Sequence, residues 1–333
     1  MNTPEKKLPQ SQQLALFQET ETGGAPATQT PATPEINARS SFNVALGSFE
    51  RYMEQRGFTE NTQQAFRLDM QLLADYLGPG TTLGQIGTAN LKAFITWMTK
   101  ARGVPCSPKT LERRITTLKV FFGWLAEEGV LPRDPAAPLI HRSVSAPLPE
   151  VLSDAEMQAV LAVTQAMRQG DEQRKPDPRP HLLVTLLLHT GIKKGECVRI
   201  VLNHLDVSDP TRPALWVRYA TPGRRHKERR IMLPAEWPTI LQEYLAVYKT
   251  RQYLFPWTAR NLEYVLTKVG QEAGIARLTF EMLRWTCSLR DYVEGMDRDA
   301  LRQKLGLSDI SWYEVEPKLA LLAQQIKVSK LES

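Results

Sequence analysis

The sequence predicts a mostly α-helical protein of two folded parts, with a small β-sheet in the second part. Apolar residues recur at steps of three and four along most of the 333 residues, as they do on one face of a helix. Two short apolar segments, 214–219 and 229–233, have the composition and length of strands. A polar segment bounded by proline, 143–150, is typical of a linker. We therefore expect one domain over 37–142 and another over 151–333.

The composition is that of an ordinary soluble globular protein. Hydrophobic residues make up 42% and charged residues 23% of the chain. No run approaches the ~18 apolar residues of a membrane span, and the first residues lack the apolar core of a secretory signal. The three cysteines are Cys106, Cys197 and Cys287. They lack the close spacing of a zinc site or a disulfide framework, so we expect no metal and no cofactor. The scattered cysteines favour a protein of the reducing cytosol.

The net charge permits a polyanionic partner without requiring one. The chain has 42 Lys and Arg against 36 Asp and Glu, which gives a formal charge of +6. This mild excess is compatible with nucleic acid, although a basic protein with no such partner shows the same excess.

The first 36 residues predict an unstructured tail with one apolar island. Pro, Thr, Gln and Ala dominate residues 1–36, and too few apolar residues are present to form a core. A short apolar segment in such a tail can become ordered in a groove of a partner. QLALF resembles the peptide by which many bacterial replication and repair proteins dock on the DNA sliding clamp, with the matching positions Gln13, Leu14, Leu16 and Phe17. A chance apolar patch is the alternative.

The part over 37–142 predicts four helices. They are expected over 41–57, 59–77, 88–100 and from 107 to at least 125, with Thr59 and Ser107-Pro108 as helix starts. The fourth helix carries basic residues that can meet DNA phosphates, namely Lys109, Arg113, Arg114 and Lys119. A solvated charged face is the alternative.

The part over 151–333 predicts a mixed but mostly helical domain. Ser153 and Glu156 form a capping box ahead of its first helix, and the apolar segment 181–191 predicts a central helix. The turn between the two strands is strongly basic. Further helices are expected over 235–248, 258–273, 279–293, 297–305 and 319–328.

These features resemble the tyrosine recombinases, the family of the phage integrases and their bacterial relatives. The resemblance covers roughly 40–330: four short helices, the segment PRDPAAPL before the linker, and an ordered set of motifs beyond it. It implies a helical core-binding (SAM-like) domain and a catalytic-type domain that clamp duplex DNA. In the family a tyrosine attacks a phosphodiester, assisted by two arginines, a lysine, an acid–base histidine and a second histidine or tryptophan.

The basic positions of this family are only partly kept. Arg284 retains the second arginine, in the phrase Glu281-Met282-Leu283-Arg284. Lys193 replaces the first arginine, which keeps the charge but loses the bidentate geometry. Arg224 occupies the position of the lysine and is a poor proton donor, because an arginine hardly titrates. Lys227 can substitute through a shift of the turn.

The remaining positions are substituted. Glu281 replaces the acid–base histidine and would repel a phosphate. Leu307 replaces the second histidine and can neither donate a hydrogen bond nor carry charge. The position of the tyrosine holds Glu316, while Tyr313 lies about one helical turn before it. In this register only Arg284 is unchanged among six positions.

Three functions follow as hypotheses. The first is a DNA-binding protein without strand cleavage, with the contacts Lys109, Arg113, Arg114, Lys119, Lys193, Arg224, Arg225, Lys227 and Arg284. The second is an active recombinase that uses Tyr313 as nucleophile through a slip of one helical turn, with Arg284 retained and with Lys193 and Lys227 in altered roles. The third is an adaptor that docks on a sliding clamp through its tail. The amphipathic segment 319–328 is compatible with self-association on DNA or with a helix folded back on its own domain. An active recombinase is a further expected partner of the protein.

Overall fold

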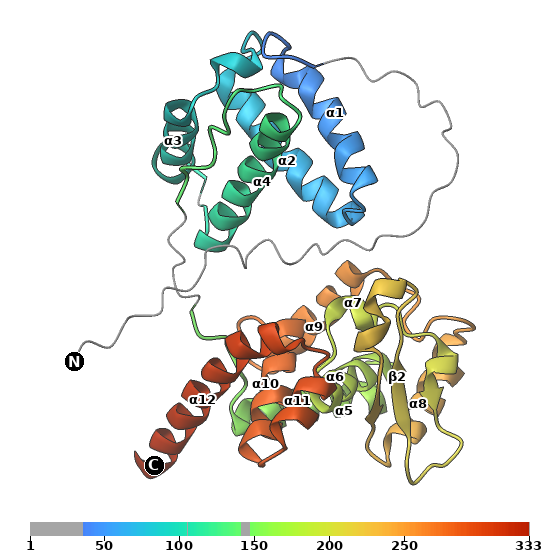
Figure 1. Cartoon of the computed structure of the whole chain (residues 1–333). Coiled ribbons are helices and arrows are strands. Elements are labelled where there is room, and N and C mark those ends of the chain that lie inside the picture. The colour runs from blue at the N-terminus through green and yellow to red at the C-terminus, as the bar shows by residue number, and fades with distance from the viewer. Residues whose placement is uncertain (1–35, 105, 141–146, 333) are drawn as a thin grey trace, which may run out of the picture. The chain divides into compact units, whose positions relative to one another are not determined.

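The computed structural model describes residues 36–104, 106–140 and 147–332, with side chains up to residue 326. The chain divides into two compact units, 1–146 and 147–333 (Figure 1). Each unit has a hydrophobic core of its own. The point of division lies inside the segment predicted as a linker. The QLALF segment of the tail lies outside the described residues.

Within 36–104 and 106–140, the first unit contains four α-helices and two short helical turns. These are α1 (Phe42–Gln55), α2 (Glu60–Leu77), η1 (Leu83–Gln85), α3 (Thr88–Thr96), the π-helical η2 (Trp97–Ala101) and α4 (Pro108–Glu127). The hydroxyls of Ser41, Thr59 and Ser107 accept amide hydrogen bonds at the starts of α1, α2 and α4. The apolar stripes of these helices meet in a core rich in aromatic rings, so the predicted four-helix unit is confirmed.

The second unit combines helices with one small antiparallel sheet. Its helices are α5 (Asp154–Gln169), α6 (Arg179–Thr190), α7 (Lys194–Cys197), α8 (Trp237–Tyr248), α9 (Ala259–Glu272), α10 (Phe280–Val293), α11 (Arg298–Lys304) and α12 (Asp309–Glu332). The strands β1 (Leu205–Asp206), β2 (Ala214–Val217) and β3 (Arg229–Met232) pair in the order β1-β2-β3. The 3₁₀ turn η3 (Leu202–His204) precedes β1, and η4 (Pro222–Lys227) lies between β2 and β3. This arrangement confirms the predicted mostly α fold with a small sheet.

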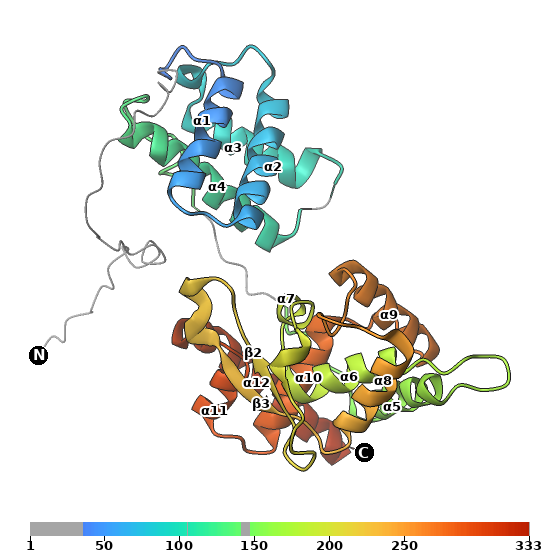
Figure 2. The ribbon, with the colours of Figure 1, turned by 90° about the vertical axis from the view of Figure 1, so that its right-hand side faces the viewer.

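Helix α6 forms the centre of the second unit. Nearly all of its residues are buried, and it packs against α5, α8, α9 and α10 (Figure 2). Gly191 ends it with a left-handed backbone, φ +58°, a conformation that favours glycine. Lys193 lies two residues after Gly191, so the position of its backbone is set by the end of this buried helix.

The C-terminal helix differs from its prediction. The helix expected over 319–328 begins already at Asp309 and contains Pro317 in its interior. An interior proline costs about 3 kcal/mol. Burial of Trp312, Leu319 and Leu322 in one apolar cluster on the same unit favours the longer helix despite this cost. Among the described residues, no helix is long and apolar enough to cross a membrane.

Candidate functional site

Arg284 lies on α10 and is bound to the backbone of two other segments. Its Nη1 donates to the carbonyl of Gly191, and its Nη2 donates to the carbonyl of Leu305 at 2.8 Å. Burial is the main cause that lowers the pKa of its guanidinium below the ordinary value, and it remains a cation at neutral pH. Arg284 therefore joins α10 to the end of α6 and to the end of α11.

A buried ion pair lies beside Arg284. Arg229 donates to both carboxylate oxygens of Glu196 at 3.0 Å, the hydroxyl of Tyr219 donates to Glu196, and the amide of Lys193 donates to it at 2.8 Å. Burial alone would raise the pKa of Glu196, but the hydrogen bonds and charge of Arg229, with the other donors, lower it to about 2. Glu196 is thus a carboxylate whose acceptor capacity is used within the protein.

Arg229 and Tyr219 have no role that was predicted from the sequence. Both flank the basic turn, and Arg229 is the last residue of the phrase Gly223-Arg224-Arg225-His226-Lys227-Glu228-Arg229. Their position next to that basic phrase is the sequence feature that could have pointed to them. Their pairing with Glu196 depends on the fold.

The structure brings several of the predicted basic residues together. The side chain of Lys193 is exposed, yet surrounding protein atoms and then the charge of Arg284 lower its pKa, and Lys227 and Arg229 act in the same direction. Arg284, Lys227 and Arg229 are therefore close enough to Lys193 to act on its charge, and the carboxylate of Glu196, which acts in the opposite direction, is already paired with Arg229. We call Lys193, Lys227 and Arg284 the basic cluster. Such a cluster favours the binding of an anion.

Arg224 and Arg225 lie beside this cluster on the turn η4. Both are exposed, and they belong to the hairpin formed by β2 and β3. Their side chains are therefore available to a polyanion that approaches the hairpin.

The three substituted positions are occupied by local contacts. Glu281 accepts a hydrogen bond from Nε1 of Trp285 at 2.9 Å on the same helix. Leu307 packs half-buried against the cluster of Trp312. Glu316 accepts from Nε1 of Trp312 at 3.0 Å and pairs with Arg298 at 3.3 Å. None of these side chains offers a donor to a phosphate.

Tyr313 projects from α12 toward solvent. It is 69% exposed, and the guanidinium carbon of Arg298 lies 5.9 Å from the centroid of its ring. In the described part of the chain, no hydrogen bond joins its hydroxyl to Arg284, Lys193 or Lys227. The structure therefore places Tyr313 on the surface beside Arg298 and not in the core.

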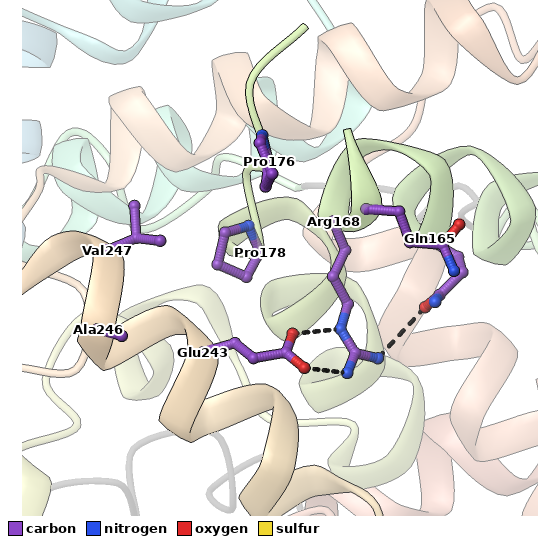
Figure 3. A pocket seen from close by; sticks show the side chains of 8 residues that line it. Gln165, Arg168, Pro176, Pro178, Glu243, Ala246 and Val247 are labelled. Carbon is purple, nitrogen blue, oxygen red and sulfur yellow. Dashed lines mark hydrogen bonds and ion pairs between the residues drawn. The ribbon is translucent and has the colours of Figure 1, made fainter. Parts of the chain in front are cut away.

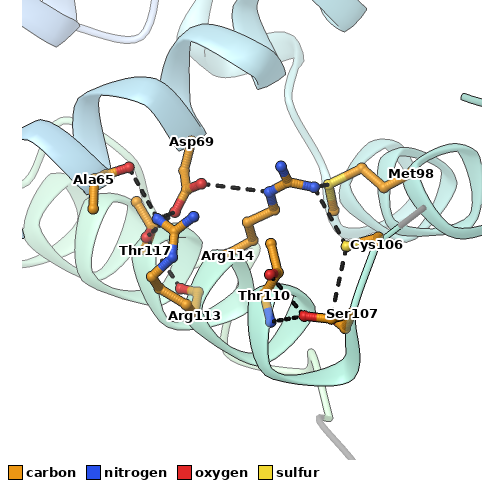
Figure 4. Close-up of polar contacts among 9 residues, drawn as sticks. All are labelled: Ala65, Asp69, Met98, Cys106, Ser107, Thr110, Arg113, Arg114 and Thr117. Atoms are coloured by element: carbon orange, nitrogen blue, oxygen red, sulfur yellow. Dashed lines mark hydrogen bonds and ion pairs between the residues drawn. The ribbon is translucent and has the colours of Figure 1, made fainter. Parts of the chain in front are cut away.

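In the first unit, two of the predicted DNA-binding residues contact a buried carboxylate (Figure 4). Asp69 of α2 accepts from Arg113, from Arg114 at 3.4 Å and from the hydroxyl of Thr117 at 2.9 Å. Arg113 also donates to the carbonyl of Ala65 at 3.1 Å. Burial is the largest influence on Asp69 and raises its pKa despite these partners. The two arginines therefore join α2 to α4.

The other two predicted residues of α4 lie at the surface. Lys109 and Lys119 are both exposed, at the first turn and beyond the middle of α4. Arg114 is mostly enclosed and also contacts the sulfur atoms of Met98 and Cys106. Of the four side chains, the two lysines are the more accessible to a phosphate.

An open hollow of about 500 Å³ lies elsewhere on the second unit and contains none of the predicted site residues (Figure 3). In it, Arg168 of α5 donates through Nε and Nη2 to Glu243 of α8 at 2.5 and 2.6 Å. This bidentate pair joins two helices and provides a comparison for the pair of Arg229 and Glu196.

Comparisons with protein families match both units. The phage integrase family model matches residues 150–314, and the model of the phage integrase N-terminal SAM-like domain matches residues 46–129. Tyrosine recombinase XerC of Listeria monocytogenes is 25% identical over 280 residues, which are 79% of this chain and 88% of that protein. XerC of Mycobacterium leprae is 31% identical over 193 residues, 57% of this chain and 61% of that protein.

Comparisons with solved structures find the same fold. The XerH site-specific recombinase bound to a palindromic difH substrate, a post-cleavage complex, aligns with a TM-score of 0.65 and 16% identity, over 87% of this chain and 84% of that chain. A lambda integrase dimer bound to a COC′ core site aligns with a TM-score of 0.64 and 15% identity, over 83% and 77%. Both units, the ordered motifs and the family models agree, and the chain therefore belongs to the tyrosine recombinase (phage integrase) family.

Proposed function

We propose that this protein clamps duplex DNA between its two units and does not cleave the strands. The observation that carries the proposal is the basic cluster of Lys193, Lys227 and Arg284, which is assembled although the nucleophile and both histidines of the family are replaced. Cations that approach phosphates supply affinity that does not depend on sequence. Arg224 and Arg225 extend this surface on the hairpin, and Lys109 and Lys119 of α4 give the first unit exposed cations of its own.

The proposed lack of cleavage rests on the chemistry of the substituted positions. A family nucleophile must attack phosphorus, but Glu316 is a carboxylate already held by Trp312 and Arg298. Leu307 cannot donate to a phosphate oxygen, and the carboxylate of Glu281 opposes its negative charge. Residues of one catalytic site act together, and loss of a single member commonly costs several orders of magnitude in rate. Loss of several members leaves binding as the function that the cluster supports.

A salt titration of duplex binding tests this proposal. We expect the logarithm of the association constant to fall linearly with the logarithm of salt concentration, by about 0.9 for each phosphate contact. The double variant Lys193→Ala/Lys227→Ala should reduce that slope by about 2. Lys175→Ala, a change of an exposed lysine in the loop before α6, should leave it unchanged. Binding that is absent or indifferent to salt would remove the DNA-binding proposal.

A second candidate function is strand cleavage through Tyr313. The exposure of its ring and the nearby Arg298 favour it, because a phosphate could reach both groups. A library of nicked duplexes, which trap a covalent protein–DNA intermediate, distinguishes the two functions. We expect no adduct from the wild-type protein. An adduct that disappears in Tyr313→Phe would establish cleavage instead.

The proposal includes protein partners of two kinds. Self-association on DNA, or association with an active recombinase, is proposed because the solved complexes of the family include DNA-bound dimers.

Docking on the DNA sliding clamp is proposed from the tail segment Gln13, Leu14, Leu16 and Phe17. Calorimetry with the purified clamp should give a binding signal that Gln13→Ala/Phe17→Ala abolishes. A signal unaffected by that variant would exclude the tail, and clamp binding without DNA binding would favour the adaptor. We place this activity at the nucleoid in the bacterial cytoplasm.

A further inference from the structure

Arg229, at the start of β3, is a basic side chain that faces the protein and not the solvent. Its side chain is only 8% exposed. Beyond the pair with Glu196, its Nε donates to the carbonyl of Lys304 at 2.7 Å, and its Nη1 donates to the carbonyl of Lys227 at 3.2 Å. A guanidinium can serve such diverging acceptors at once because its five donors lie in a rigid planar fork.

The acceptors of Arg229 belong to the segments that carry the basic cluster. Glu196 holds the backbone amide of Lys193 at 2.8 Å, so the first contact reaches the segment that follows α6. The carbonyl of Lys227 belongs to the basic hairpin. The carbonyl of Lys304 is followed by that of Leu305, which accepts from Arg284 at 2.8 Å. The side chain of Arg229 thus contacts the backbone of Lys227 directly. It reaches the amide of Lys193 through Glu196, and it contacts the carbonyl next to the one that accepts from Arg284.

Gly306 is shaped to admit this arginine. Its backbone is left-handed, φ +60°, and a Cβ atom at this position would lie 2.6 Å from Nη1 of Arg229. Any larger residue would displace the guanidinium from its acceptors. The contact between Arg229 and the carbonyl of Lys304 therefore requires both the glycine after α11 and the arginine at the start of β3.

We propose that Arg229 is a positioning residue that holds Lys193, Lys227 and Arg284 in the spacing at which they bind neighbouring phosphate oxygens. This inference rests on the proposed DNA binding and deepens it, because it identifies what orders the binding surface. Arg229 touches no DNA in this role. Its loss is expected to reduce the number of phosphate contacts without removing any of the contacting side chains.

The variant Arg229→Lys tests this role in the full-length protein. It keeps the positive charge, but an ammonium group at the end of a flexible chain cannot serve Glu196 and both carbonyls in the same geometry. We expect duplex affinity to fall at least tenfold and the salt slope to fall by about 1 to 2, because each lost phosphate contact removes about 0.9. Arg168→Ala is the matched control. It breaks the bidentate pair with Glu243 in the same unit, and it should lower stability while the salt slope stays unchanged.

Tyr219→Phe provides a second, milder variant. It removes only the hydroxyl that donates to Glu196, so it tests the same network if Arg229→Lys does not fold. We expect it to weaken duplex binding and reduce the salt slope in the same direction, to a smaller extent. Circular dichroism at the temperature of the binding assay verifies that each variant is folded.

The outcomes separate this inference from the proposed function. Salt-dependent binding by the wild type, with the same slope in folded Arg229→Lys and in Tyr219→Phe, would overturn the positioning role and leave DNA binding intact. Absence of salt-dependent binding by the wild type would overturn both. A reduced slope in the two variants, with the control unchanged, would support the role of Arg229.

Discussion

Replacing Glu196 with glutamine removes the charge from the buried pair with Arg229 while nearly preserving the shape of the side chain. The pKa of Glu196 is about 2, compared with 4.5 for an ordinary glutamate. At about 1.4 kcal/mol for each pH unit, this difference corresponds to roughly 3 kcal/mol of folding free energy at neutral pH. Since the substitution also leaves the guanidinium of Arg229 without its counterion, we expect a loss of at least this size.

The pH dependence of this loss follows from the direction of the pKa. The folded-state pKa of Glu196 lies below its unfolded value, so its contribution is fully present above about pH 4.5 and is lost as pH falls toward about 2. The stability difference between wild type and Glu196→Gln should therefore stay constant from pH 8 to about 5 and shrink below that range. Hydrogen exchange of the amides of α6 and α10 measures the difference at pH 7, and thermal unfolding follows it with pH.

Glu263→Gln is the control for this experiment. Glu263 pairs with Lys194 at 2.7 Å, but both side chains are well exposed, so its loss should cost less than about 1 kcal/mol. Equal stability of Glu196→Gln and wild type at pH 7 would refute the reasoning. A difference that changes steeply between pH 8 and 5 would refute it as well, because another group would then be responsible.

Three further predictions concern buried side chains. Burial lowers the pKa of His181 to about 4, so the second unit should lose up to roughly 3 kcal/mol as pH falls from about 6.5 to 4. His181→Asn should flatten that decline in thermal unfolding, and an unchanged decline would exclude this histidine. Asp69→Ala removes the acceptor of Arg113, Arg114 and Thr117, and it should speed amide exchange in α2 and α4 by a destabilisation of about 2 kcal/mol. The exposed Asp75→Ala should have little effect, and equal effects would contradict the role of Asp69. Trp312 is 1% exposed, and Trp312→Ala should destabilise the packing of α12 by about 3–5 kcal/mol. Unaltered exchange of the α12 amides would show that this tryptophan does not anchor the helix.

The helices that the sequence predicted well are those whose pattern is local. Helices α1, α2 and α4 each bury one apolar stripe and begin at a hydroxyl cap, and both signals lie within a few neighbouring residues. Strand β1 was missed because two residues carry no readable alternation. The predicted start of α12 was too late in the sequence. The apolar contacts that stabilise this helix despite Pro317 involve residues outside the segment, so the local pattern does not reveal them.

The candidate site divides in the same way. The sequence located Lys193, Lys227 and Arg284, because each lies in a short motif whose order along the chain is characteristic. It could not show that Arg113 and Arg114 contact Asp69, since those partners are 44 and 45 residues apart.

The sequence by itself determined the family and the two helical units, and it predicts that the catalytic positions are substituted, since these are properties of residue type and spacing. Only the tertiary structure decided which charges are available and which are used internally. Arg229 and Lys304 are 75 residues apart, and their contact exists only because β3 and α11 pack together. Whether an arginine contacts a phosphate or a buried carboxylate depends on burial and on distant partners, and neither is encoded in the neighbouring residues.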